Sequence, residues 1–195
     1  MDSVQTSAYT AARDGDLEKV KALLNDNPQL VFSRNETGST LLHMAVLNGH
    51  RDVAELLLAR KAIVSAPATD GVTPLHWAAL KGYRDVAELL LACGAAANAR
   101  DNEGYTPLHF ATWKGHRDVA ELLLLNKADA SAKEKFGNTP LHFAADRDFK
   151  EIAGLLLARG ANVNAENYKG RTPLWMAKQS VAELLRQHGA AANRL

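Results

Sequence analysis

Histidines are the residues of this chain best suited to chemistry at neutral pH, because imidazole can bind a metal ion or act as a general base. The copies lie at His43, His76, His109 and His142 in one slot of a recurring phrase, at His50 and His116 in a second slot, and at His188 near the C-terminus. A metal site needs several ligands that converge on one point. Residues repeated every 33 positions lie one helix layer, about 10 Å, apart. The pattern therefore favours histidines that hydrogen-bond between neighbouring units.

Other reactive side chains give no stronger signal. Cys93 is the only cysteine, which excludes an internal disulfide and fits a reducing compartment. It stands beside Gly94, and the sequence contains no GxSxG elbow, Walker loop, CxxC or GxGxxG motif. Carboxylate pairs such as Asp85 and Glu88 have the spacing of a solvated helix surface. The sequence therefore predicts no catalytic residue, no cofactor, no metal ion and no small-molecule substrate.

Composition and charge are those of an ordinary globular protein. Of 195 residues, 47% are hydrophobic and 23% are charged, and the formal net charge is +1. The N-terminus has an early acid and no apolar run, and no stretch approaches the roughly 18 apolar residues that a membrane span needs. We therefore expect a cytoplasmic, monomeric protein without membrane contact.

Basic residues form two columns, which raises the question of a phosphate backbone as partner. The columns are Arg51, Arg84, Arg117 and Lys150, and then Lys81, Lys114 and Arg147. Each member of the first column is followed directly by an acid, so much of its field cancels. Nucleic-acid binding is kept only as an alternative.

The elements that position these side chains are read from a repeated phrase. "TPLHWAALKGYRDVAELLL" begins at Thr73, and related phrases begin at Thr40, Thr106, Thr139 and Thr172, always 33 residues apart. Threonine before proline starts a helix, and a glycine such as Gly82 stops it. A second helix carries a leucine run. One such pair cannot bury its leucines alone, but stacked pairs can, so the sequence predicts an all-α repeat solenoid.

The chain resembles the ankyrin repeat family in several words that recur in register. They include "DNEGYTPLHFATWKGHRDVAELLL" from Asp101 and "GANVNAENYKGRTPL" from Gly160, with the same 33-residue period. The resemblance covers essentially the whole chain. It implies helix-turn-helix units with β-hairpin-like fingers in a curved stack, used as a protein-binding scaffold without catalysis.

We expect a single domain over residues 1–195 with six repeats, two of them caps. The N-terminal cap spans 1–34, the internal repeats span 35–67, 68–100, 101–133 and 134–166, and a shortened C-terminal cap spans 167–195. Lys19 and Arg186 replace core residues of the inner copies, as expected where an outer face meets water. The last repeat lacks about four residues between its helices, so it forms either a tight corner or a nearly continuous helix from Pro173 to Gln187.

Several positions depart from the family pattern. Lys61 and Lys127 stand where other copies have the glycine that ends the second helix, which strains that turn by about 1 kcal/mol. In the fifth repeat Asp148 and Phe149 replace Gly and His, and Gly154 interrupts a helix. We therefore predict that the fifth repeat is the least stable inner unit.

Partner binding is expected where copies differ and face solvent, which the resemblance places on the fingertips and on the first helices. From these slots we select the large aromatic, apolar and charged side chains, because aromatics beside arginine and lysine match the composition of interface hot spots. The predicted partner-binding residues are Val72, Leu80, Lys81, Tyr105, Trp113, Lys114, Phe136, Asp146, Arg147, Tyr168 and Arg171. Trp77 and Phe110 occupy the slot of Met44 and are predicted to belong to the core.

The leading hypothesis is a non-catalytic scaffold that holds a protein partner on its concave, finger-lined side. One alternative is a regulator or inhibitor that blocks the surface of a partner enzyme. Others are enzymatic activity, for which the chain offers no uncommitted nucleophile with a base, a nucleic-acid-associated module, and a ligand-free structural or designed repeat protein.

Overall fold

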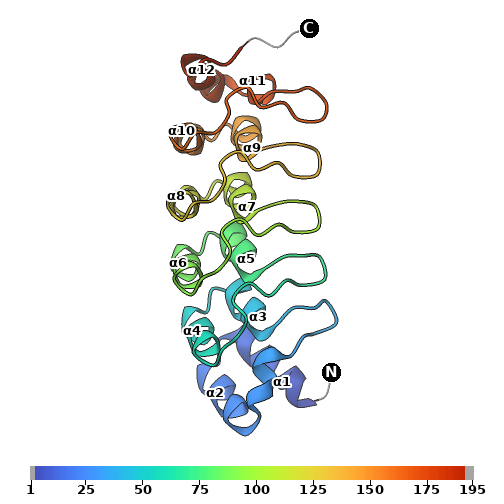
Figure 1. Cartoon of the computed structure of the whole chain (residues 1–195). Coiled ribbons are helices and arrows are strands. Elements are labelled where there is room, and N and C mark those ends of the chain that lie inside the picture. Colours follow the sequence, from blue (N-terminus) through green and yellow to red (C-terminus); the bar gives the residue numbers. More distant parts are fainter. Residues whose placement is uncertain (1–2, 192–195) are drawn as a thin grey trace.

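The computed structural model describes residues 3–191, which form a single column of stacked helix pairs (Figure 1). Within that range the chain has α-helices and one 3₁₀ helix but no strand. The helices are α1 (Ser3–Asp14), α2 (Leu17–Asp26), η1 (Pro28–Phe32), α3 (Leu41–Leu47), α4 (Arg51–Ala59), α5 (Pro74–Lys81), α6 (Arg84–Ala92), α7 (Pro107–Lys114), α8 (Arg117–Leu125), α9 (Pro140–Arg147), α10 (Lys150–Ala158), α11 (Pro173–Met176) and α12 (Gln179–Gln187). The predicted helical solenoid is confirmed.

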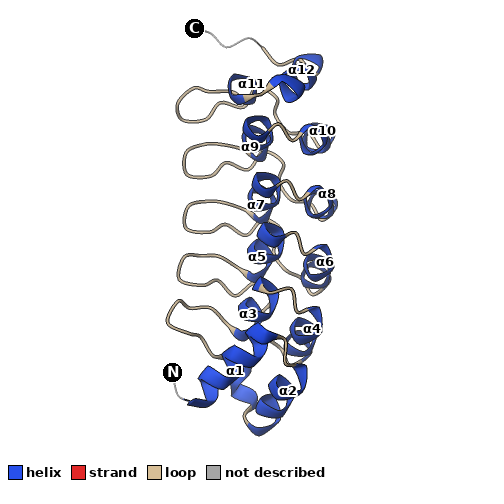
Figure 2. Ribbon diagram, turned by 180° about the vertical axis from the view of Figure 1, so that it is seen from behind, coloured by secondary structure: helices blue, strands red, loops and turns tan. Residues whose placement is uncertain are grey.

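Helices of odd and even number form two separate layers. Each odd-numbered helix packs on the next one, α3 on α5 and α5 on α7 for example, and each even-numbered helix packs on its own partner and on its neighbours above and below. Both views show the long loops leaving the odd-numbered layer on the side away from the even-numbered one (Figures 1 and 2). We call these loops, each of which connects the second helix of one repeat to the first helix of the next, the fingers.

The first helix of each inner repeat starts and stops as its sequence predicts. In α5, proline occupies the first turn, and His76 accepts a hydrogen bond at Nδ1 from the backbone N–H of Thr73, 3.0 Å away. Gly82 ends the helix at φ 76°, in the left-handed region where a side chain would add strain. These local signals fix the length of the helix, and its start at Pro74 marks the end of the preceding finger.

A continuous core of leucines, valines and alanines runs between the two layers. Leu75, Leu108 and Leu141 are at most 1% exposed and contribute the same slot from successive repeats. Small side chains at Ala78 and Ala111 are fully buried, which allows the odd-numbered helices to approach closely. Burial of this kind is possible only because each repeat covers the leucines of the next one.

Rings from one repeat lie against glycines of the repeat before it. A Cβ atom added to Gly82 would stand 2.6 Å from Nδ1 of His116, and one added to Gly115 would stand 2.8 Å from Cζ of Phe149. His50 meets Gly15 in the same way. The glycines are therefore needed twice, for their positive φ and for the close approach of the next layer.

The fingers are joined to one another by backbone hydrogen bonds. The amide of Asn102 donates to the carbonyl of Asp70 at 2.9 Å, and the amide of Lys135 donates to Glu103 at 2.8 Å. The amide of Tyr168 likewise donates to the carbonyl of Phe136 at 3.0 Å. One such bond per repeat holds the row of fingers in register.

The two terminal repeats show the expected polar outer faces. Lys19 is exposed where the inner copies bury a valine or isoleucine, and Arg186 is exposed where the inner copies have a buried or half-buried leucine. In the last repeat, α11 ends at Met176 and Ala177 takes an extended conformation (φ −71°, ψ 138°) before α12 begins. The chain therefore turns a tight corner, and the alternative of a nearly continuous helix is wrong.

Three residues that depart from the family pattern adopt the backbone conformation of the glycine that they replace. Lys61 and Lys127 have φ values of 68° and 63°, and Asp148 has 60°. Asp148 also has a second role, because its Oδ1 accepts a hydrogen bond from the amide of Val181 in α12 at 3.0 Å. The carboxylate of one repeat thus caps the second helix of the next.

Candidate partner-binding surface

The repeated histidines serve as links between repeats. In each of the four copies Nδ1 accepts the amide of the preceding threonine, and Nε2 donates to a carbonyl in the next finger. For His76 this carbonyl is that of Tyr105, at 3.1 Å, and for His109 it is that of Asn138, at 3.3 Å. His50 and His116 lie against backbone carbonyls of the repeat before them, 2.8 and 3.0 Å away. The predicted hydrogen bonding between repeats is confirmed.

Burial keeps the linking histidines neutral. Desolvation lowers the pKa of His76 from 6.5 to about 4, against a smaller opposing effect of the hydrogen bond to Tyr105. The pKa of His109 is lowered to about 4 for the same reason. No group of three or more His, Cys, Asp or Glu side chains within residues 3–191 has an arrangement that could hold a metal ion.

Two hollows lie side by side between the fingers and the odd-numbered helices. The first, of about 480 Å³, is lined by Asp70, Val72, His76, Trp77, Leu80, Asp101, Asn102, Glu103 and Phe110, and we call it the Val72 hollow. The second, of about 390 Å³, is lined by Asp101, Glu103, Tyr105, His109, Phe110, Trp113 and Phe143, and we call it the Tyr105 hollow. The hollows share three residues, so together they form one surface across successive repeats, the finger groove.

Tyr105 is the centre of the aromatic wall. Its ring centroid lies 5.7 Å from that of Phe110 and 6.0 Å from that of Phe143, which come from α7 and α9. It also meets the ring of His109 edge-on at 5.8 Å. Such distances are typical of favourable aromatic pairs, so the wall is fixed by contacts within its own repeat and with the next one.

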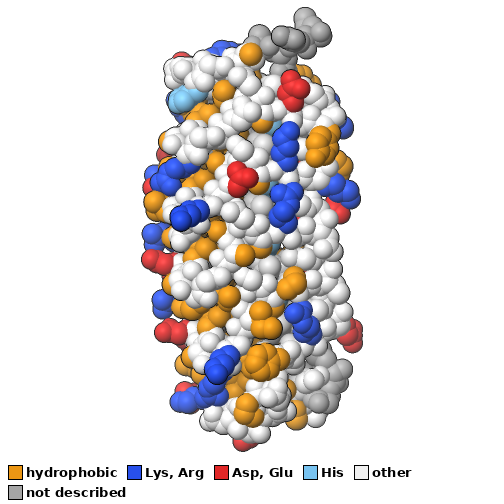
Figure 3. Space-filling view, viewed as in Figure 1, with side chains coloured by type: hydrophobic (Ala, Val, Ile, Leu, Met, Phe, Trp, Pro, Cys, Tyr) orange, Lys and Arg blue, Asp and Glu red, His pale blue; other side chains and the backbone are white. Residues whose placement is uncertain are grey.

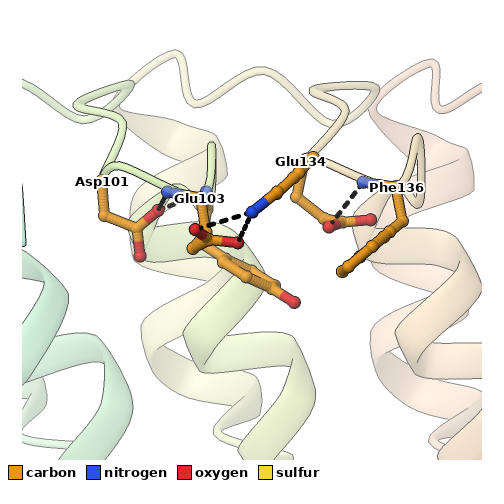
Figure 4. A network of polar contacts seen from close by, with 6 residues as sticks. Asp101, Glu103, Glu134 and Phe136 are labelled. Atoms are coloured by element: carbon orange, nitrogen blue, oxygen red, sulfur yellow. Dashed lines mark hydrogen bonds and ion pairs between the residues drawn. The ribbon is translucent and has the colours of Figure 1, made fainter.

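The finger that overhangs both hollows carries two carboxylates, Asp101 and Glu103 (Figure 4). Oδ1 of Asp101 accepts the amides of Glu103 at 3.0 Å and of Tyr105 at 2.8 Å, which holds the tip of the finger in a tight turn. Glu103 pairs with the ammonium group of Lys135 at 2.8 Å, and both side chains are about half exposed. The edge of the groove is therefore acidic and preformed.

In the next finger a buried acid plays the same structural part. Glu134 is 1% exposed, and its two oxygens accept the amides of Phe136 at 2.9 Å and of Asn138 at 2.8 Å. The ring of Phe136 hangs beneath this turn (Figure 4) and is 56% exposed. Phe136 is thus presented on the finger row without lining either hollow.

Cationic side chains surround the outer part of Trp113. The Nζ atom of Lys114 lies 4.2 Å from the centre of the Trp113 ring, and Cζ of Arg147 lies 5.8 Å from it. Both distances are within the range of a cation–π interaction. Trp113 is 37% exposed and also lines the Tyr105 hollow. It therefore lies between the acidic groove and the basic C-terminal ends of α7 and α9, at Lys114 and Arg147.

The comparison with known families can now be set beside this geometry. The family described as ankyrin repeats (3 copies) matches residues 2–68, 61–134 and 122–194, which is nearly the whole chain. The chain belongs to the ankyrin repeat family. A search of curated proteins gives no match.

Ankyrin repeats are generally protein–protein interaction modules, and ankyrin repeat proteins are typically non-catalytic. No helix within residues 3–191 is both long and apolar enough to cross a membrane. On the face of this ankyrin array seen in Figure 3, basic side chains are interspersed with acidic and hydrophobic ones and form no unbroken stripe.

The ankyrin fold brings together only part of the predicted binding set. Four members line the finger groove: Val72, Leu80, Tyr105 and Trp113. The exposed charges Lys81, Lys114, Asp146 and Arg147 lie at the ends of the odd-numbered helices. Tyr168, 74% exposed, stands on the last finger, and Arg171 stacks on Trp175 with its Cζ 3.9 Å from the ring centre.

Sequence reasoning missed part of the groove. Trp77 and Phe110 are half-buried and line the hollows, so their assignment to the core was only half right. Phe143 and Asp101 were not selected at all, although both line the Tyr105 hollow. The sequence did contain a signal for both residues. Phe143 occupies the same slot as Phe110 one repeat later, and Asp101 lies at the start of a fingertip, where a carboxylate can accept the backbone amides of the turn.

Proposed function

We propose that this ankyrin repeat protein is a non-catalytic scaffold that binds a partner protein in the finger groove. The observation that supports the proposal most directly is the pair of adjoining hollows, which share Asp101, Glu103 and Phe110. Together with the exposed aromatics of the last two fingers they follow the finger row over several repeats. A surface of this extent is compatible with the roughly 800 Å² per partner of a standard interface.

The rigidity of the groove favours this function. Backbone hydrogen bonds join neighbouring fingers, and ring contacts with Phe110 of its own repeat and Phe143 of the next fix Tyr105. A surface that is ordered before binding loses little conformational entropy when a partner docks. The partner therefore meets anchors that are already in place.

Affinity capture from a native lysate tests the proposal. The wild type is compared with a Tyr105→Ala and Trp113→Ala double variant, and with Leu125→Ala as control. Leu125 is 61% exposed at the end of α8, in the other helix layer, so its truncation removes apolar surface far from the groove. We expect the double variant to lose partners that the wild type and the control retain. Partners retained equally by all three would refute this location.

The same experiment separates the alternatives. A captured enzyme whose activity falls on addition of this protein would identify a regulator that blocks a surface. Nucleic acid recovered with a steep salt dependence would indicate a nucleic-acid-associated module instead. We also propose that the protein is a cytoplasmic monomer, which fractionation and sedimentation equilibrium would test.

A further inference from the structure

We propose that the Tyr105 hollow seats one cationic side chain, arginine or lysine, of the partner. The inference rests on the proposed function and names the chemistry that the groove selects. It is carried by the combination of an aromatic wall with carboxylates on the finger above it.

The charge of the groove favours a cation. Three carboxylates line the two hollows, those of Asp70, Asp101 and Glu103, and no lysine or arginine belongs to either lining. Glu103 is already paired with Lys135 of the next finger, so the charge that favours a cation is mainly that of Asp70 and Asp101. Oδ1 of Asp101 and Oδ1 of Asp70 accept amide hydrogens of their own fingers, which fixes both groups without neutralising their charge.

The negative field reaches the wall itself. Burial is the main cause that raises the pKa of Tyr105, and the charges of Glu134, Asp101 and Glu103 raise it further. The pKa of Asp101 is likewise raised, first by desolvation and then, against the opposing hydrogen bonds, by Asp70 and Glu103. A positive group in the hollow would relieve this accumulation of like charge.

The aromatic rings supply the second half of the recognition. Tyr105, Phe110, Trp113 and Phe143 all contribute to the lining, and a cation within about 6 Å of such a ring is attracted to its face. The chain already shows that Trp113 accepts this contact, because Lys114 and Arg147 lie 4.2 and 5.8 Å from its ring centre. The planar guanidinium of arginine suits such walls especially well, since it stacks on rings while it pairs with carboxylates.

Small probes test the charge preference without knowledge of the partner. The indole N–H signal of Trp113 is followed by NMR during titration with N-acetyl-arginine-N-methylamide, its lysine analogue, and the neutral norleucine analogue of similar length. We expect the two cationic probes to bind at millimolar concentration, and norleucine to bind at least several-fold more weakly. Norleucine binding as tightly as the cations would overturn the inference, as would a Trp113 signal that none of the probes moves.

Variants then assign the preference to the hollow. Asp101→Asn keeps the oxygen that accepts the two finger amides but removes the charge, and Glu103→Gln removes the second charge. Each is expected to weaken arginine binding about twofold to fivefold, as for an exposed ion pair. Glu36→Gln alters an exposed acid on a finger two repeats away and is the control. An equal effect of the three substitutions would overturn the inference.

The ring contribution is measured with Tyr105→Leu, which keeps an apolar side chain but removes the π face. We expect the preference for arginine over norleucine to fall about twofold to fivefold, while an unchanged amide spectrum elsewhere shows that the array is folded. An unchanged preference would refute the role of the ring. Failure of these tests leaves the scaffold proposal intact, because partner capture by the groove is measured separately.

Discussion

Acid should destabilise this protein well before its carboxylates are protonated, because His76 and His109 are held neutral. Burial lowers the pKa of each from 6.5 to about 4. In the unfolded chain both side chains take up a proton near pH 6.5, so the unfolded state binds more protons between pH 6.5 and pH 4. The contribution of these histidines to the free energy of unfolding is therefore complete above pH 6.5 and decreases as the pH falls from 6.5 to 4. Below pH 4 these two groups cause no further loss of stability.

The size of the effect follows from the two pKa values. Each pKa unit between the folded and unfolded states corresponds to about 1.4 kcal/mol. Relative to pH 8, each histidine therefore lowers the free energy of unfolding by about 2 kcal/mol at pH 5 and by about 3 kcal/mol below pH 4. His43 and His142 contribute with the same sign, since burial also lowers their pKa values. The loss is a large part of the stability of a typical domain.

The hydrogen-bond geometry explains why the buried histidines remain neutral. In His76, Nδ1 faces the amide N–H of Thr73 at 3.0 Å, and Nε2 faces the carbonyl of Tyr105 at 3.1 Å. Only the neutral ring with its hydrogen on Nε2 matches both partners. A second proton on Nδ1 would point one donor at another, inside a site that is almost free of solvent.

The assay is urea unfolding of the wild type and of a His76→Gln and His109→Gln double variant at pH 8.0, 6.5 and 5.0. Glutamine can still accept the threonine amide, as in a capping box, but it does not titrate. At pH 8 we expect the variant to be the less stable protein, because it loses both links to the next finger. Its deficit should then shrink by about 4 kcal/mol between pH 8 and pH 5. His188→Gln, at an exposed position, controls for the substitution. A deficit that stays constant over this range would refute the reasoning.

Three further predictions concern the backbone. Lys61→Gly and Lys127→Gly should each stabilise the protein by about 0.5–1 kcal/mol in urea unfolding, since both lysines have positive φ, whereas Cys93→Gly, at φ −86°, should destabilise it. Gly154→Ala should stabilise α10 by about 0.5–1 kcal/mol, because an added Cβ meets no atom within 4 Å. In hydrogen exchange, residues 134–166 should be the least protected inner repeat of the wild type, and Gly154→Ala should raise their protection. Equal protection of residues 101–133 and 134–166 in the wild type would contradict this. Removal of the carboxylate in Asp148→Gly should increase exchange in α12 at pH 7 while sparing α1. Hydrogen bonds from the Ser180 side chain and then the Val181 amide lower the Asp148 pKa below 3.8, so the difference in α12 exchange between wild type and variant should persist while the buried histidines take up protons and should be lost only below pH 3.8.

The helix pairs could be predicted from the sequence because every signal is local and repeated. Thr73, Pro74 and Gly82 define one helix without reference to the rest of the chain, and the 33-residue period then fixes the stack. The histidine links were also predictable, since identical spacing forbids convergence on one metal ion. The shortened last repeat has no local signal that chooses between a corner and a helix, and its contacts at the corner include hydrogen bonds to Asp148 and Ala145 of the preceding repeat.

The groove was harder to predict because it depends on side-chain direction across repeats. Tyr105 was chosen from its fingertip slot, but its contacts with Phe110 and Phe143 come from two different helices. Trp77 was assigned to the core because it occupies the slot of Met44, whereas its side chain is only half-buried. Partial exposure of this kind depends on the angle between layers, which periodicity does not encode.

The contact between the ring of one repeat and the glycine of the repeat before it has a mechanical consequence. Where His116 rests on Gly82, the imidazole ring is in direct contact with the glycine backbone, and an added Cβ atom would stand 2.6 Å from Nδ1. A methyl group introduced there would act as a wedge at one level of the column. The resulting tilt displaces distant levels in proportion to their height, so a substitution far from Tyr105 could misalign both ends of a long ligand without touching it.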